Sequence, residues 1–239
     1  MVNSSLTKFC IQDLIPGSTK TSGKKVDVDA ILPYLIVPGL LLIGSISRTI
    51  TITVMVVIAM GALYVHSRPR QKNRSPFFFS WTISSGLYMF LVFENGILCF
   101  LEITMLENSI FLLLFLCTLY FFYKMKSIAE YELTGTGTKG KEYRWDCCVL
   151  RPNYLHFLAG HTFALATLLL GTNLGLTTVC QPFIFYGAIL MPFDCDDIYY
   201  DFKMAICFVT SIYALGYALV VALVLIRQLI VYLPKYSGK

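Results

Sequence analysis

The chain has 239 residues, of which 56% are hydrophobic and 14% are charged, and its formal net charge is +5. Soluble domains carry about 25% charged residues, so this composition excludes an ordinary water-soluble fold and predicts a surface that faces lipid. The mean hydropathy of +0.68 agrees with this interpretation. The excess of basic residues does not indicate nucleic acid as a partner, because these residues cluster at the ends of the apolar segments.

Residues 1–30 precede the first apolar run. They contain four lysines among small polar residues, and they lack the continuous apolar core that a secretory signal peptide requires. We expect this segment to be a cytosolic N-terminal tail that is not removed from the protein.

Six apolar runs follow, each close to the length that a membrane-spanning helix uses. They are residues 31–47, 49–65, 77–93, 109–123, 154–179 and 204–232. Because backbone groups in hydrocarbon must bond within their own segment, such runs predict helices. The expected fold is all-α, a polytopic membrane helix bundle with about six transmembrane helices. Pro33 and Pro38 interrupt the first run, so a re-entrant hairpin with the second run, and a total of four or five spans, are the alternatives.

The expected organisation has six parts along the chain. They are a cytosolic tail (1–30), two transmembrane helices or a hairpin (31–65), transmembrane helices three and four (66–125), a cytosolic loop (126–153), transmembrane helices five and six (154–232) and a second cytosolic tail (233–239). The loop at 126–153 is the longest of the predicted connections.

Lysine and arginine lie almost entirely on one side of this topology. Seventeen of the 19 fall on the side of the two tails, and only Arg48 and Lys203 fall on the other. Short loops rich in Lys and Arg stay in the cytosol. We therefore expect both termini in the cytosol and the protein in an endomembrane or the plasma membrane. The expected partners are the lipid bilayer and other membrane proteins.

The predicted spans contain few ionisable residues, and His161 is the main exception. Transport proteins place charged residues or broken helices near the bilayer centre. The spans therefore argue against a channel or transporter subunit, which stays as an alternative. We expect His161 to hydrogen-bond a neighbouring helix or to reach the membrane surface.

Cys147 and Cys148 are adjacent in the loop before the fifth run. One interpretation is a pair of reduced cysteines in an amphipathic cytosolic loop. A second is a pair of reversible S-acylation sites, which juxtamembrane cysteines often are. A third is a zinc site, but two adjacent cysteines and one histidine do not supply four well-spaced ligands.

Residues 148–157 read CVLRPNYLHF, and residues 75–81 read SPFFFSW at the start of the third run. The first segment resembles the Cys-Val-Gly-x-x-Asn-His-x-x-Phe segment of the DHHC protein S-acyltransferases (palmitoyltransferases). The second is similar to the start of that family's four-helix core. In the first segment Cys148, Val149, Asn153 and Phe157 match in register, and His156 lies among them. The resemblance implies a helical membrane protein that transfers acyl groups from acyl-CoA to protein cysteines and binds Zn²⁺.

Other features of that family are missing. The sequence has no Asp-His-His-Cys motif, and Leu150 and Tyr154 replace the family's Gly and His. The family's mechanism needs a low-pKa thiolate to accept the acyl group. We therefore expect the family's framework without transferase activity, and we predict no catalytic and no metal-binding residues. A divergent pseudoenzyme and a product that lost the zinc-domain exons both fit, and a non-catalytic membrane scaffold or partner subunit is the alternative.

Cys180 and Cys195 lie in the segment between the fifth and sixth runs, on the predicted non-cytosolic side. In an oxidising lumen these two cysteines would form a disulfide. A pair of free thiols near the membrane is the alternative.

Overall fold

A computed structural model describes most of the chain. The described residues are 28–67, 77–97, 104–134, 153–179, 181–184, 190–194 and 198–231. The candidate S-acylation pair Cys147 and Cys148, the neighbouring Val149 and the candidate disulfide pair Cys180 and Cys195 lie outside the described residues.

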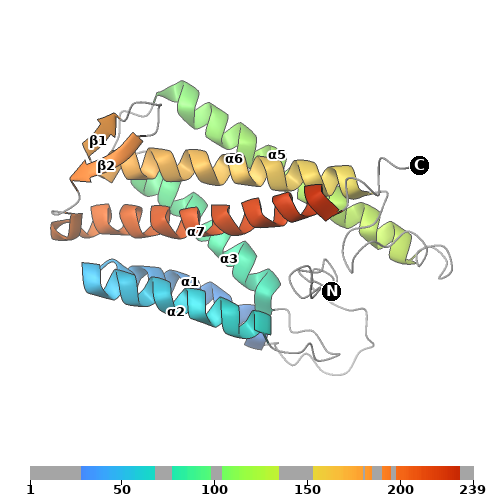
Figure 1. The fold of residues 1–239 in the computed structure, drawn as a ribbon, viewed down its shortest axis with the longest axis horizontal. Helices are drawn as coiled ribbons and strands as arrows, with labels where there is room; N and C mark the ends of the chain where they lie inside the picture. Colours follow the sequence, from blue (N-terminus) through green and yellow to red (C-terminus); the bar gives the residue numbers. More distant parts are fainter. Residues whose placement is uncertain are drawn as a thin grey trace. The chain divides into compact units, whose positions relative to one another are not determined.

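The described residues are mainly helical (Figure 1). The helices are α1 (Val28–Gly44), α2 (Arg48–Ser67), α3 (Phe77–Val92) with its π-helical continuation η3 (Phe93–Ile97), α5 (Met105–Thr134), α6 (Tyr154–Val179) and α7 (Phe202–Val231), which follows the short 3₁₀ turn η5 (Ile198–Tyr200). Each of the six apolar runs thus forms a helix, which confirms the helical fold class.

Three of these helices are long and apolar enough to cross a membrane. Their apolar segments are Met105–Ile128 of α5, Tyr154–Thr177 of α6 and Phe202–Ile230 of α7. The apolar parts of α1 and α2, Ile31–Gly44 and Arg48–Gly61, are shorter. The structure therefore supports a membrane protein, and the count of six spans stays a prediction.

Helix α5 is longer than the fourth apolar run predicted. It begins at Met105, four residues before the run, because Thr104 and Glu107 form a capping box. The Thr104 backbone N–H donates to Glu107 Oε2 at 3.0 Å, and the Glu107 N–H donates to Thr104 Oγ1 at 3.4 Å. The helix ends at Thr134, so the predicted loop at 126–153 begins as helix.

A small β-hairpin between α6 and α7 was not expected from the sequence. Its strands are β1 (Gln181–Ile184) and β2 (Leu190–Asp194), which pair antiparallel. Gln181 pairs with Asp194 and Ile184 with Leu190 at the two ends of the ladder. The all-α prediction therefore needs this one correction.

The described chain divides into two compact units. The α5 unit contains residues 109–134, 153–168 and 217–231. The α3 unit contains residues 28–67, 77–97, 104–108, 169–179, 181–184, 190–194 and 198–216. Helices α6 and α7 each contribute residues to both units.

In the α3 unit, α1 packs against both α2 and α3. The turn between α1 and α2 is closed by Thr51, whose hydroxyl donates to the Gly44 carbonyl at 2.6 Å. This carbonyl lies at the end of α1, where helical partners run out. The Thr51 hydroxyl also lies 2.7 Å from the Tyr199 hydroxyl, so residues 148 positions apart fix the turn together.

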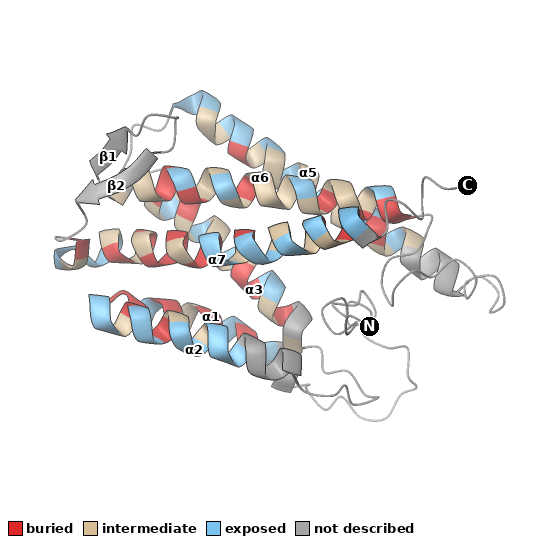
Figure 2. Cartoon of the chain, in the orientation of Figure 1, coloured by how far each residue is buried: buried red, intermediate tan, exposed pale blue. Residues whose placement is uncertain are grey.

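In the α5 unit, α5 contacts the first half of α6. The Phe121 and Phe163 rings are stacked, with centroids 5.3 Å apart and planes 8° apart. Helix α5 otherwise buries little of its surface, and its residues are mostly intermediate or exposed (Figure 2). Leu113, Leu116 and Leu119 are each at least half exposed, as lipid-facing side chains would be.

Candidate functional site

The described part of the DHHC-like segment forms the start of α6. Asn153 and Tyr154 are fully buried, and Phe157 is 6% exposed. The Tyr154 hydroxyl donates to the backbone carbonyl of Gln228 on α7 at 3.1 Å. This bond ties the start of α6 to α7.

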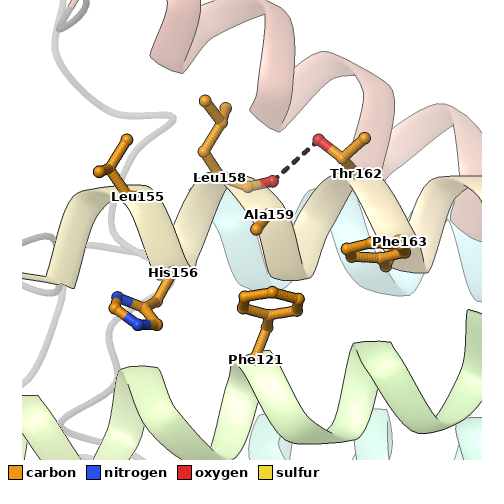
Figure 3. Close-up of a pocket in the computed structure, with 7 residues that line it drawn as sticks. All are labelled: Phe121, Leu155, His156, Leu158, Ala159, Thr162 and Phe163. Atoms are coloured by element: carbon orange, nitrogen blue, oxygen red, sulfur yellow. Dashed lines mark hydrogen bonds between the residues drawn. The ribbon is translucent and has the colours of Figure 1, made fainter.

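An open apolar groove lies along α6 in the same unit, with Phe121 of α5 at its edge (Figure 3). Its volume is about 500 Å³. The lining residues are Phe121, Leu155, His156, Leu158, Ala159, Thr162 and Phe163. Almost all of the lining is carbon. His156 is the one lining side chain that carries nitrogen. The sequence alone did not predict this groove.

Figure 3 shows Phe121 of α5 between His156 and Phe163 of α6. The ring centroids of Phe121 and His156 are 6.2 Å apart. The Thr162 hydroxyl donates to the Leu158 carbonyl at 2.9 Å, so it is already satisfied by its own helix. Among the described residues, the groove therefore holds no nucleophile paired with a base.

Among the described residues, His161 bonds its own helix, whereas the sequence suggested a bond to a neighbouring helix or a place at the membrane surface. Its Nδ1 lies 2.8 Å from the Phe157 carbonyl one turn earlier on α6. Its ring is 4.0 Å from the Phe157 ring and packs edge-on against Phe122 of α5 at 5.2 Å. The histidine is thus a packed structural residue, and the expectation is corrected to a partner on its own helix.

A buried polar cluster in the α3 unit was missed by sequence reasoning. Trp81 Nε1 donates to the Tyr213 hydroxyl at 3.0 Å, and the Ser85 hydroxyl lies 2.8 Å from the same oxygen. The hydroxyl of Ser84, the residue before Ser85, donates to the Pro33 carbonyl at 3.1 Å. These bonds join α3 to α7 and to α1. A Trp and a Tyr inside apolar runs were the available signal, because their polar ends require partners when buried.

The described residues contain no candidate metal site. Within those residues, no group of three or more His, Cys, Asp or Glu side chains could hold a metal ion. Cys117 and Cys207 are free thiols, and each lies within an apolar helix. The described residues therefore offer no zinc site, and Cys147 and Cys148 lie outside them.

No protein-family model, curated protein or solved structure matches the chain. The resemblance to the DHHC acyltransferases consequently rests on the two short segments at 75–81 and 148–157 and on the order of the apolar runs.

Proposed function

We propose that this chain is a multi-pass helical membrane protein with a DHHC-like framework that does not itself transfer acyl groups. In this proposal it crosses the membrane six times with both termini in the cytosol, and it acts as a non-catalytic scaffold or partner subunit. The distribution of the basic residues supports the orientation, because 17 of the 19 lie on one side.

One structural observation carries the non-catalytic role. The buried hydroxyl and indole groups bond across helices, as Tyr213 and Tyr154 do, and they do not converge on the groove. Interhelical hydrogen bonds of this kind hold membrane helices together. An acyltransferase of the DHHC type would need an activated thiolate facing its acyl donor, and the sequence offers no Asp-His-His-Cys motif to supply it.

The anchored start of α6 supports Cys147 and Cys148 as acceptors of an acyl group. Cys148 is five residues before Asn153, so an extended chain would place it no more than about 18 Å from that buried residue. The pair is thus tethered close to the end of a predicted span. A separate membrane acyltransferase would catalyse the transfer: the Cys147 or Cys148 thiolate attacks an acyl thioester, a new thioester forms, and the thiol of the donor, ultimately CoA, is released.

The test combines a transfer assay with acyl labelling in cells. Purified full-length protein with palmitoyl-CoA should transfer no acyl group to a cysteine-containing peptide. In cells, label that hydroxylamine removes should appear on the wild type and on Cys117→Ser. It should disappear from the Cys147→Ser, Cys148→Ser double variant.

Turnover in the first assay would overturn the non-catalytic proposal. Persistent label on the double variant would overturn the assignment of the acylated cysteines.

A further inference from the structure

We propose that the Tyr199 hydroxyl is a latch that holds α2 closed, and that α2 opens as one body when the latch breaks. Tyr199 belongs to η5, the short turn before α7. Its hydroxyl lies 2.7 Å from the hydroxyl of Thr51 on α2. The inference goes beyond the proposed function, and it concerns residues of the α3 unit alone.

The hydrogen bonds at Thr51 have a definite direction. A threonine hydroxyl carries one proton, and Thr51 donates that proton to the Gly44 carbonyl at 2.6 Å. Tyr199 is therefore the donor in its bond with Thr51. The bond to Gly44 stays within the hairpin of α1 and α2, whereas the bond from Tyr199 links α2 to η5.

Helix α2 buries few of its side chains. Of its residues 48–61, whose burial is described, only Thr51 and Val54 are buried. Ile52 and Val56 are each more than half exposed. In lipid, apolar packing gives little advantage, because the lipid tails are as apolar as the side chains. A hydrogen bond to a neighbouring element therefore matters more for α2 than it does for a well-buried helix.

Helix α1, on the other side of the same turn, is fixed more firmly. Val37, Leu41 and Ser45 lie one turn apart, and each is at most 2% exposed. The Ser84 hydroxyl of α3 donates to the Pro33 carbonyl of α1 at 3.1 Å. An opening at the turn therefore moves α2 and leaves α1 packed on α3.

The latch itself has a fixed base and lies close to water. Ile198 and Ala205 are buried next to Tyr199, and the Tyr199 ring packs edge-on against Phe208 with centroids 6.5 Å apart. The next residue, Tyr200, is 89% exposed. Because water at this end can replace the lost hydrogen bond, the opening of α2 leaves neither hydroxyl without a partner.

Hydrogen exchange of the full-length protein in lipid nanodiscs, followed by mass spectrometry, tests the latch. Tyr199→Phe removes the donor and keeps the ring. Peptides from α2 (48–61) should exchange about threefold faster, the factor that corresponds to an average interhelical hydrogen bond in a membrane. Peptides from α7 (205–216) should exchange as in the wild type. The matched control Tyr200→Phe should change neither helix.

A pair of substitutions at Thr51 tests the same bond from the other side. Thr51→Ser keeps the hydroxyl and should exchange as the wild type does. Thr51→Val should open α2 at least as much as Tyr199→Phe, because it also removes the bond to Gly44. This pair decides the question if Tyr199→Phe does not fold.

Unchanged exchange of α2 in Tyr199→Phe, or in Thr51→Val, would overturn the inference. So would an equal acceleration in the α2 and α7 peptides, because Tyr199 would then stabilise the whole unit and would not act on α2 in particular.

Discussion

The α3 unit and the α5 unit hold their helices together in different ways. In the α3 unit glycines let side chains of a neighbouring helix come close, and a Cβ added to Gly96 would lie 2.8 Å from Cys207 Sγ. Hydroxyl and indole groups then bond across the short gap, as Trp81, Ser85 and Tyr213 do. In the α5 unit the stacked rings of Phe121 and Phe163 join α5 to α6, and an open groove lies along α6 beside Phe121.

The difference follows from the physics of association in lipid. Burial of apolar surface gives little advantage there, because lipid tails are as apolar as the side chains. Small residues and hydrogen bonds therefore determine which helices pack tightly. The α3 unit has both, whereas the contact between α5 and α6 in the α5 unit is made by aromatic rings.

The largest expected difference in stability is between alanine substitutions at two glycines of α6, one in each unit. In Gly175→Ala the new methyl group would overlap Ser211 Oγ and lie 2.9 Å from Ile97 Cδ1, and overpacking of this kind should cost about 3 kcal/mol. In Gly160→Ala the nearest atoms, on Phe121 and Phe122, are 3.4 Å away. This variant should be neutral, or more stable by up to about 1 kcal/mol from helix propensity.

Unfolding of the two variants by SDS in mixed micelles measures the contrast. Gly216→Ala is a further control, because an added Cβ there would have no neighbour within 4 Å. Equal losses of unfolding free energy in Gly175→Ala and Gly160→Ala would contradict the proposed difference between the units.

The hairpin next to the α3 unit's helices should carry a disulfide between Cys180 and Cys195. The two cysteines are the chain neighbours of Gln181 and Asp194, which pair across the ladder. A crosslink over a loop of this length should stabilise the protein by about 3 kcal/mol. Mass mapping of a non-reduced digest should find the linked peptides, and Cys180→Ser should lower the free energy of unfolding by that amount.

A variant with Cys117→Ser is the control for the disulfide, since that thiol is free in α5. Two alkylatable thiols at positions 180 and 195 in protein isolated from membranes would contradict the prediction.

Among the substitutions predicted to destabilise the protein, removal of the Tyr213 hydroxyl from the buried polar cluster should lower its stability least. Tyr213→Phe takes away the acceptor of the Trp81 N–H and the partner of the Ser85 hydroxyl. Interhelical hydrogen bonds in membranes contribute about 0.6 kcal/mol each on average, so the loss should be about 1 kcal/mol. Tyr200→Phe, at a site 89% exposed, should change nothing, and an equal loss in both variants would refute the role of the cluster.

The helices were predictable because each comes from one local run of apolar residues. Helix α6 begins at Tyr154 and ends at Val179, as its run predicted. The early start of α5 could also have been predicted, because Thr104 and Glu107 have the spacing of a capping box. The prediction followed the apolar run alone and therefore placed the start too late. The hairpin was not predictable in this way, since a four-residue strand such as Gln181–Ile184 has too few positions to show an alternating pattern.

The candidate site was less predictable, because it depends on pairs of residues that lie far apart in the chain. Tyr154 meets Gln228 across 74 residues, and Trp81 meets Tyr213 across 132. One sequence shows that such side chains need partners, but it does not identify the partner. The groove arises in the same way, because Phe121 and Phe163 are far apart in sequence and become its walls only after α5 and α6 pack.

Glycosylation mapping tests the central claim most directly, namely that lipid surrounds these helices and that the basic segments lie in the cytosol. Acceptor sites would be inserted singly at 68–74, at 139–146 and between β1 and β2, and the variants expressed with microsomes. The account predicts glycosylation of the hairpin site alone. Glycosylation at either basic segment, or release of the protein from the membranes by alkaline carbonate, would contradict it.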